Sequence, residues 1–146
     1  MLQNIISNIF SKNMVIEKGL YLVATPIGNV NDITIRAIKI LNRSDTIVCE
    51  DTRVSKKLFS HLGLPIKKKN WLIYNDHSSD KDITKILSEL DKDKVISLIS
   101  DAGTPLISDP GYKLLRRIRQ SGHNIFSLPG PCSAISSLII SGLKTD

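Results

Sequence analysis

The sequence predicts an α/β fold, in which a five-stranded, mainly parallel sheet carries helices on both faces. The first observation behind this prediction is that short apolar runs alternate five times with segments of helical periodicity. The second is that a helical segment separates each run from the next, as the crossover between parallel strands requires. The third is the composition, because 41% hydrophobic and 23% charged residues are typical of a globular domain of 146 residues.

The expected strands are five short apolar runs. They are residues 20–25, 46–49, 71–74, 95–99 and 124–128. The third is the weakest of them, whereas the first reads Leu-Tyr-Leu-Val-Ala and is almost continuously apolar. The apolar character of the first, fourth and fifth strands predicts burial on both faces, as expected inside a parallel sheet.

Each expected strand is followed by an expected helix. The first helix should begin at about Ile33 with Asp32 as its N-cap, and the second should run from Arg53 to about Leu62, where Gly63 ends it. The other three are expected from apolar residues at helical spacing. These residues are Ile83, Ile86, Leu87 and Leu90; Leu114, Leu115 and Ile118; and Ala134, Ile135, Leu138 and Ile139.

Several protein classes are disfavoured by the composition. Two cysteines, Cys49 and Cys132, form neither a disulfide framework nor a metal cluster, and the three histidines lack ligand spacing. No apolar run reaches the roughly 20 residues that a membrane span needs, and residues 1–18 lack the features of a secretory signal. A reducing cytoplasm is therefore the expected compartment. The formal net charge of +6 suits a polyanionic partner such as RNA, although a basic surface can also serve solubility alone.

Polar residues, glycine and proline gather in the segments that follow the five expected strands. These segments read TPIGN at 25–29, EDTR at 50–53, NDHS at 75–78, SDAGTP at 100–105 and PGPCS at 129–133. In a parallel sheet all five emerge at the carboxyl edge, where ligands of open α/β sheets bind. Any one of them could be ordinary turn and capping chemistry, but all five together indicate a binding site.

Two common nucleotide-binding motifs are missing from these segments. Neither the G-x-G-x-x-G of dinucleotide-binding sheets nor the G-x-x-x-x-G-K-[ST] of P-loop ATPases occurs. Loops stiffened by proline offer oriented backbone amides and carbonyls to a ligand without a pyrophosphate. Adenosine with a sulfonium and an amino acid tail fits that description.

Four stretches resemble, in this order, the branch of the tetrapyrrole methylase family that modifies ribosomal RNA. They are LVATPIGNVND at 22–32, EDTR at 50–53, SDAGTPLISDPG at 100–111 and LPGPCS at 128–133. The likeness covers residues 19–146 and leaves 1–18 as an N-terminal extension. It implies S-adenosylmethionine-dependent methylation of a cytidine 2′-hydroxyl in small-subunit (16S) rRNA, with the rRNA or the 30S subunit as partner and a homodimer for the full-length family.

The resemblance also implies residue roles. The cofactor-binding residues would be Thr25, Pro26, Gly28, Asn29, Asp101, Ala102, Gly103, Thr104, Pro105, Pro129, Gly130, Pro131, Cys132 and Ser133. Asp101 and Glu50 are the carboxylates expected to act as general base, with His77 as a second candidate and no metal implied. RNA phosphates would be contacted by Arg53, Lys56, Lys57, Lys67, Lys68 and Lys69.

Each of these roles has a simpler alternative. Asp101 could be a loop-capping residue, His77 an exposed loop histidine, and the basic residues a solvated surface. The family carries a second α/β domain, which the 146 residues do not include, so we expect weak or absent activity from this chain alone. A non-catalytic module that binds RNA or a partner chain, and a tetrapyrrole methylase, stay open as alternatives.

Overall fold

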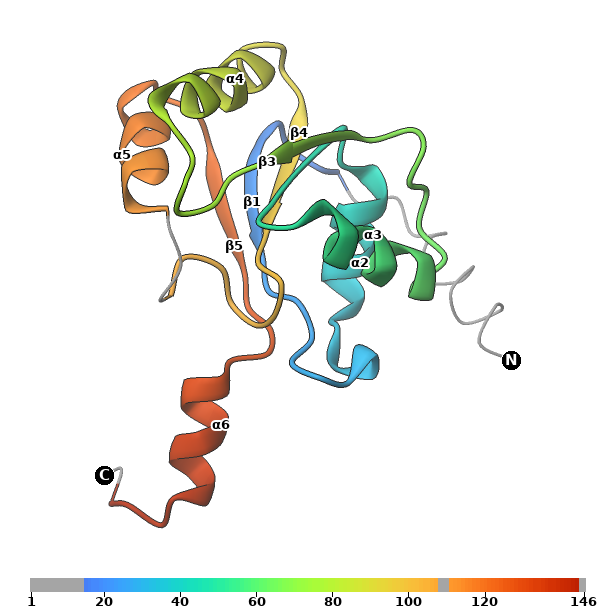
Figure 1. Ribbon diagram of the computed structural model, residues 1–146, viewed down its shortest axis with the longest axis vertical. Helices are drawn as coiled ribbons and strands as arrows, with labels where there is room; N and C mark the ends of the chain where they lie inside the picture. Colours follow the sequence, from blue (N-terminus) through green and yellow to red (C-terminus); the bar gives the residue numbers. More distant parts are fainter. Residues whose placement is uncertain (1–14, 108–110, 145–146) are drawn as a thin grey trace.

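The computed structural model in Figure 1 describes residues 15–107 and 111–144. Most of the expected N-terminal extension, residues 108–110 of the SDAGTPLISDPG stretch and residues 145–146 lie outside this description. The five strands are β1 (Gly19–Val23), β2 (Thr46–Cys49), β3 (Asn70–Ile73), β4 (Val95–Ile99) and β5 (Ile125–Leu128). They form one sheet in the order β3-β2-β4-β1-β5, and every strand pair is parallel. The predicted five-stranded parallel sheet is confirmed.

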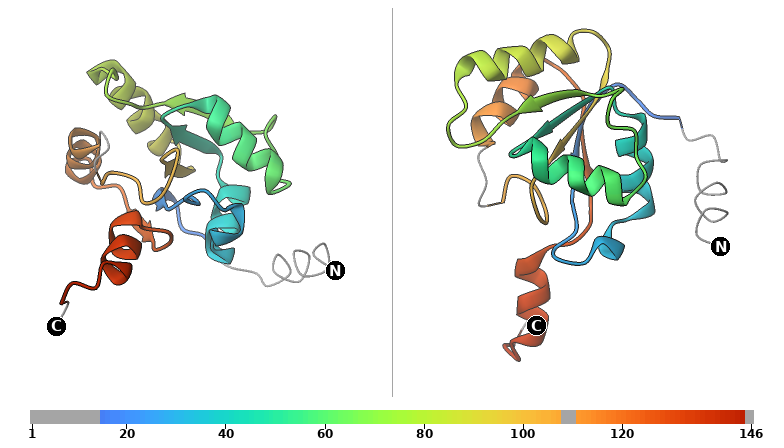
Figure 2. Two further views of the ribbon diagram at one scale, coloured as in Figure 1. Left: turned by 60° about the horizontal axis from the view of Figure 1, so that its bottom comes forward. Right: turned by 45° about the vertical axis from the view of Figure 1, so that its right-hand side comes forward.

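Four helices cover the two faces of this sheet. The helical elements are η1 (Val30–Asp32), α2 (Ile35–Arg43), α3 (Thr52–His61), α4 (Asp80–Leu90), α5 (Tyr112–Gln120) and α6 (Ser133–Ile140). Figures 1 and 2 show α2 and α3 on one face and α4 and α5 on the other, whereas α6 projects away from the body. No helix within residues 15–107 and 111–144 has both the length and the apolar character to cross a membrane.

The alternation of side chains along each strand divides the core into two layers. Tyr21 and Val23 of β1 pack with α2 and α3, whereas Leu20 packs with α4 and α5. Phe59 of α3 and Ile86 of α4 are fully buried in their respective layers. Burial of one such side chain stabilises the fold by about 1.5–3 kcal/mol, so the two layers together hold the helices on the sheet.

The chain changes direction within the sheet between β1 and β4. Helices α2 and α3 connect β1 to β2 and β2 to β3, in one direction across the sheet. Helices α4 and α5 connect β3 to β4 and β4 to β5, in the other direction. The loops after β1 and β4 therefore leave neighbouring strands toward opposite faces. Such a switch point, at the carboxyl ends of the strands, is where open α/β sheets bind ligands.

The first helix begins later than predicted. Asp32 does not cap α2, because it lies in the short 3₁₀ helix η1, whose own cap is the side chain of Asn29. The cap of α2 is Thr34, which has extended backbone dihedrals and whose hydroxyl accepts the N–H of Ala37 at 3.1 Å. Both Asn29 and Thr34 are good capping residues, and the extra turn between them displaces the helix start.

The fifth strand is less buried than predicted, and the last helix is exposed. β5 forms an edge of the sheet, and three of its four residues are partly or fully exposed. α6 has no buried residue, and its apolar side chains Ile135, Leu138, Ile139 and Ile140 are exposed. The prediction of burial on both faces is wrong for β5, because no further strand among residues 15–107 and 111–144 pairs with it and α6 does not fold back over it.

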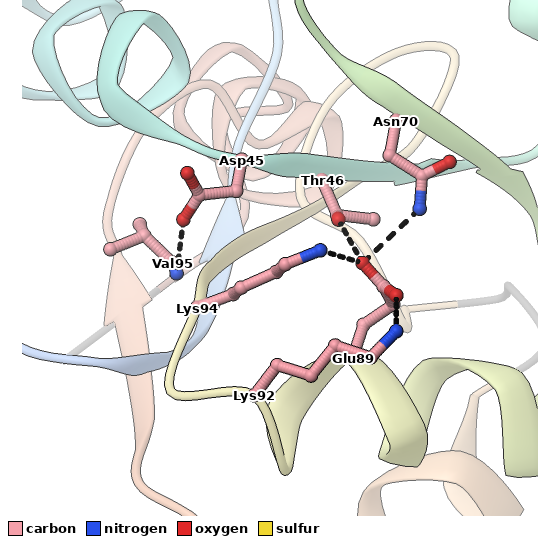
Figure 3. A network of polar contacts seen from close by, with 7 residues as sticks. All are labelled: Asp45, Thr46, Asn70, Glu89, Lys92, Lys94 and Val95. Atoms are coloured by element: carbon pink, nitrogen blue, oxygen red, sulfur yellow. Dashed lines mark hydrogen bonds and ion pairs between the residues drawn. The ribbon is translucent and has the colours of Figure 1, made fainter.

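A network of charged and polar groups centred on Glu89 joins three strand beginnings at the amino edge of the sheet (Figure 3). The Glu89 carboxylate, at the end of α4, accepts hydrogen bonds from Thr46 of β2 at 3.0 Å and Asn70 of β3 at 3.2 Å. It also pairs with Lys92 and Lys94, each at 2.6 Å. The hydrogen bonds from the two lysines are the main reason why the pKa of Glu89 falls from 4.5 to about 2.

Candidate active site

The loops after β1 and β4 are joined directly at the switch point. Thr25 and Gly103 form an antiparallel bridge, in which each backbone N–H donates to the other carbonyl at 2.9 and 3.0 Å. The buried Thr25 hydroxyl donates to the Ser100 carbonyl at 3.1 Å. β1 ends at Val23, earlier than predicted, because the chain turns here to make this bridge.

The β4 loop has an unusual backbone. Gly103 has φ +81°, and Leu106 has φ +70°, a conformation that residues with a Cβ seldom adopt. The Ser100 hydroxyl lies within hydrogen-bonding distance of the carbonyls of Ala102 and Gly103, at 3.2 and 3.1 Å. Left-handed non-glycine residues persist where the surrounding structure holds them and often lie at ligand sites.

The β5 loop packs against the other two. The Thr104 hydroxyl donates to the Pro131 carbonyl at 3.0 Å, which links the β4 and β5 loops. Gly130 lies so close to β1 that a Cβ built on it would be 2.8 Å from the Cβ of Ala24. Three loops distant in the sequence therefore form one connected unit at the carboxyl edge.

The cofactor-binding residues predicted from the sequence divide by exposure into three groups within this unit. Thr25, Gly103 and Pro105 are buried, and Thr25 and Gly103 hold the loops together through hydrogen bonds. Pro26, Thr104, Pro131 and Cys132 are partly exposed. The exposed members are Gly28, Asn29, Asp101, Ala102, Pro129, Gly130 and Ser133. The surface offered to a ligand is therefore mostly backbone and small side chains.

An open hollow of about 640 Å³ lies beside the connected loops. Gly130, Pro131 and Ser133, three of the residues expected to bind the cofactor, line it. Its further lining residues are Ile27, Asp32, Thr34, Ser136, Ser137 and Ile140. Ile27 belongs to the 25–29 loop that the sequence places at the site, whereas sequence reasoning did not name the other five, although Asp32 belongs to the stretch LVATPIGNVND that carries the resemblance.

The two candidate catalytic carboxylates lie next to each other. Glu50 follows β2 and Asp101 follows β4, and these strands are neighbours in the sheet. The backbone N–H of Asp101 donates to Glu50 Oε1 at 3.3 Å. Asp101 is exposed and Glu50 is partly exposed, so a substrate in front of this edge can reach both residues.

Asp51 and Arg53 of the EDTR stretch bind each other. Asp51 is the N-cap of α3 and accepts the backbone N–H of Arg53 at 2.7 Å, while the Arg53 guanidinium lies 2.6 Å from its carboxylate. The hydrogen bonds from the Arg53 side chain and backbone lower the pKa of Asp51 from 3.8 to about 2. Asp51 therefore remains ionised at neutral pH and serves to start the helix.

His77 lies farther from the centre of the edge than the carboxylates. It is exposed on a turn after β3, and its backbone N–H donates to Asn75 Oδ1 at 3.0 Å. β3 is the outermost strand on that side, two strand spacings from β4, which corresponds to roughly 10 Å. The geometry therefore favours Glu50 and Asp101 over His77 as the groups near the switch point.

The residues predicted to contact RNA are separated by the fold. Arg53, Lys56 and Lys57 lie on α3 near the carboxyl edge, and the Lys56 ammonium lies 5.5 Å from the ring centroid of Trp71. Lys67, Lys68 and Lys69 precede β3 and lie at the opposite, amino edge. Lys67 and Lys68 are exposed.

Lys69 differs from its two neighbours. Its ammonium donates to the Asn42 carbonyl at 2.6 Å and also to the Ser44 carbonyl, where α2 ends. Burial lowers the pKa of this lysine. Lys69 therefore holds the end of α2 in place, a role that its position in a run of three lysines does not reveal.

The comparison with known proteins decides the family. The sequence model described as Tetrapyrrole (Corrin/Porphyrin) Methylases matches residues 19–146, the range that contains the sheet and all the loops described above. The chain belongs to the tetrapyrrole methylase family. Members of this family transfer a methyl group, and their reaction consumes a methyl donor. Within the described residues no group of three or more potential ligand side chains could hold a metal ion.

Several tetrapyrrole methylases similar to this chain are named ribosomal RNA small subunit methyltransferase I. The protein from Rickettsia prowazekii (strain Madrid E) is 53% identical over 133 residues, which are 91% of this chain and 46% of that protein. The protein from Escherichia coli O157:H7 is 44% identical over 127 residues, 87% of this chain and 43% of that protein. The chain thus spans about half the length of the curated relatives it matches.

Solved structures of tetrapyrrole methylases share the fold at low sequence identity. Cobalt precorrin-4 methyltransferase, a cobalamin biosynthetic enzyme, superposes with a TM-score of 0.66 at 17% identity, over 86% of this chain and 51% of that chain. Uroporphyrin-III-C-methyltransferase from Thermus thermophilus gives 0.64 at 18% identity, over 88% and 55%. Both likenesses confirm the predicted α/β architecture and carry no information on the substrate.

Proposed function

We propose that this chain forms the cofactor and catalytic edge of an S-adenosylmethionine-dependent methyltransferase that modifies a cytidine 2′-hydroxyl in small-subunit rRNA. The observation that carries the proposal is that the loops after β1, β4 and β5 meet at the switch point beside a hollow. These loops contain the stretches that resemble the rRNA branch of the family. The names of the relatives, at up to 53% identity, point to the same substrate class.

The residues around the hollow suit S-adenosylmethionine. The volume of the hollow, about 640 Å³, falls within the usual range of small-molecule sites. Ile27, Pro131 and Ile140 offer apolar surface to an adenine ring. The Asp32 carboxylate can accept hydrogen bonds from the ribose or the ammonium group of the tail, and the Ser133 hydroxyl can both donate and accept. When bound, this cofactor supplies a methyl group from its sulfonium.

The protein's own contribution to the reaction is alignment and proton removal. Loops held together by backbone hydrogen bonds position a ligand with little movement, and positioning can supply several kcal/mol of the barrier. Glu50 or Asp101 would accept the proton of the 2′-hydroxyl, and the oxygen would receive the methyl group that the cofactor supplies, with the methyl–sulfur bond broken and a neutral thioether released. Because both lie at the surface between β2 and β4, a ribose can approach them from solvent.

The 146 residues supply one wall of this site under the proposal. The relatives are about twice as long as the matched region, and α6 presents an unpartnered apolar surface beside the hollow. We expect the second half of such a relative to pack on this surface and to close the site, so that the chain alone is weakly active or inactive. The same exposed helix keeps open the alternative of a non-catalytic module that binds RNA or a partner chain.

A chimera tests the proposal directly. Residues 1–146 are joined to the carboxyl half of the Rickettsia prowazekii relative, and the product is incubated with small ribosomal subunits carrying unmodified rRNA and methyl-labelled S-adenosylmethionine. We expect label in a 2′-O-methylcytidine, and at least a tenfold slower rate for the variant that loses the general base, Asp101→Asn or Glu50→Gln. The full-length relative is the positive control.

Two outcomes would contradict the proposal. A folded chimera that binds S-adenosylmethionine but leaves the rRNA unlabelled would exclude this reaction. Label transferred instead to a uroporphyrinogen substrate, offered in a parallel reaction, would support the tetrapyrrole methylase alternative. Circular dichroism of each protein shows whether it is folded before activity is compared.

A further inference from the structure

A strongly basic helix, α5, lies outside the candidate site. α5 reads Tyr-Lys-Leu-Leu-Arg-Arg-Ile-Arg-Gln and contains four cations and no acidic residue. The cations are Lys113, Arg116, Arg117 and Arg119, and all four are exposed. Figure 1 shows α5 at the outside of the molecule, beside α4.

The charges of α5 are not neutralised by the rest of the described protein. None of its four cations takes part in an ion pair or side-chain hydrogen bond anywhere in residues 15–107 and 111–144. The neighbouring α4 is different, because Lys85 there pairs with Asp82. A cation in the first turn, such as Lys113, also opposes the positive end of the helix dipole. Arg117 and Arg119 lie in the last turn, where cations favour the helix dipole, so internal stability accounts for their positions but not for those of Lys113 and Arg116.

The spacing of the exposed residues places an aromatic ring among the cations. Tyr112, Arg116 and Arg119 are four and three residues apart, so they lie in one row along the helix. Tyr112 as a whole is 76% exposed. All three line an open hollow of about 400 Å³ on the helix surface. Adjacent cations and an exposed ring are the combination with which proteins bind RNA, through its phosphates and a stacked base.

The row begins close to the candidate active site. Gly111, directly before α5, lies against Leu106 of the β4 loop, since a Cβ on Gly111 would be 1.8 Å from Leu106 Cδ2. Arg119 lies seven residues after Tyr112, and a helix rise of about 1.5 Å per residue separates the two by about 10 Å. An RNA strand whose ribose lies at Glu50 and Asp101 can continue onto this helix.

We propose that the exposed face of α5 is an RNA-binding surface, on which Lys113, Arg116, Arg117 and Arg119 contact phosphates and Tyr112 stacks on a base. The identity of the partner as RNA rests on the proposed function. The surface itself was not among the RNA-binding residues predicted from the sequence, which lie on α3 and before β3.

The test compares two double variants that each remove two positive charges. One is Arg116→Gln/Arg119→Gln on α5, and the matched control is Arg36→Gln/Arg43→Gln, two exposed arginines of α2 on the other face of the sheet. Binding of a fluorescein-labelled RNA hairpin to the 146-residue chain is followed by anisotropy over a series of salt concentrations. We expect the α5 variant to bind roughly tenfold or more weakly at about 0.1 M salt, and its log K against log salt slope to fall by about two.

The control variant should keep the slope of the unmodified chain. Equal losses in the two double variants, or an unchanged slope in the α5 variant, would overturn the proposal. Tyr112→Ala should weaken binding roughly tenfold at every salt concentration without changing the slope, and Tyr112→Phe should restore it, because stacking needs the ring and not the hydroxyl. A Tyr112→Ala variant that binds as the unmodified chain would remove the stacking role.

Failure of this inference is distinguishable from failure of the proposed function. If the chimera methylates no RNA but the α5 variant still loses RNA binding, the reaction is wrong and the surface stands. If the chimera methylates rRNA and α5 substitutions leave RNA binding unchanged, the surface is wrong. Phosphatidylserine vesicles form a further arm, since α5-dependent vesicle binding without α5-dependent RNA binding would overturn the assignment to RNA.

Discussion

The two edges of the sheet use polar residues in opposite ways. At the amino edge, the buried carboxylate of Glu89 is bound by Thr46, Asn70, Lys92 and Lys94. At the carboxyl edge, hydrogen bonds of backbone and hydroxyl groups hold the loops together. The side chain of Asp101, a candidate general base, is exposed to solvent there. The difference teaches that the carboxylate at the amino edge stabilises the fold, whereas the carboxylate of Asp101 at the carboxyl edge is accessible to a ligand.

This comparison also separates lysines that the sequence alone treats as equivalent. Lys69 and Lys94 are bound within the protein at the amino edge, to carbonyls and to Glu89 respectively. The cations of α5 have no such partners among the described residues. Substitution of Lys69 or Lys94 should therefore lower stability, whereas substitution of the α5 cations should change ligand binding.

The largest loss of stability is expected from Glu89→Ala. It removes the shared acceptor of two hydrogen bonds and two ion pairs and leaves Thr46 and Asn70 without it. Hydrogen bonds to charged groups are worth about 1.5–3 kcal/mol, so we expect a loss of about 2–3 kcal/mol in urea unfolding. Glu17→Ala, at an exposed position, is the control and should change stability by less than about 0.5 kcal/mol. Equal effects of the two substitutions would contradict the structural role of the network.

The same carboxylate makes stability depend on pH. The pKa of Glu89 is lower in the folded protein, about 2, than its ordinary value of 4.5, so its contribution is complete above pH 4.5 and is lost as the pH falls toward 2. Urea unfolding at a series of acidic pH values should show this loss. Glu89→Gln should flatten the dependence in that window, and an unchanged profile would show that other carboxylates dominate acid unfolding.

A smaller effect is expected at the carboxyl edge from Gly130→Ala. The added methyl group would lie 2.8 Å from the Cβ of Ala24, and overpacking of this kind costs about 1–3 kcal/mol. The double variant Ala24→Gly/Gly130→Ala removes the clash and should recover part of the loss in thermal unfolding. If the double variant is less stable than Gly130→Ala by the full cost of Ala24→Gly, the two positions do not interact.

How far the sequence predicts this molecule depends on whether a feature is local. The buried strands were found because their apolar runs are continuous, and the loops at the carboxyl edge because a parallel sheet places them there. The exposure of α6 and the binding of Lys69 to two carbonyls could not be predicted, since both depend on contacts between distant segments. Asp32 is not the cap of α2, because an extra 3₁₀ turn capped by Asn29 contains it and the helix itself begins after Thr34.

The smallest effect is expected from Arg53→Ala. Arg53 is 90% exposed at its side chain, and its ion pair with Asp51 lies at the surface. Exposed ion pairs contribute little to stability. The melting temperature should therefore fall by less than about one third of the fall seen for Glu89→Ala. Because Asp51 still caps α3 through backbone N–H groups, Asp51→Ala should lower stability more than Arg53→Ala. The reverse order would contradict this account of the EDTR stretch.

The most direct test of the central claim is a titration of the ¹⁵N-labelled 146-residue chain with S-adenosylmethionine, followed by two-dimensional NMR. The account predicts shifts that gather in residues 25–29, 101–105 and 130–133, the loops of the carboxyl edge, even where binding is too weak for calorimetry. Amides around Glu89 and Lys94 at the amino edge should not move. Shifts at the amino edge, or none in the three loops at millimolar ligand, would contradict the assignment of the site.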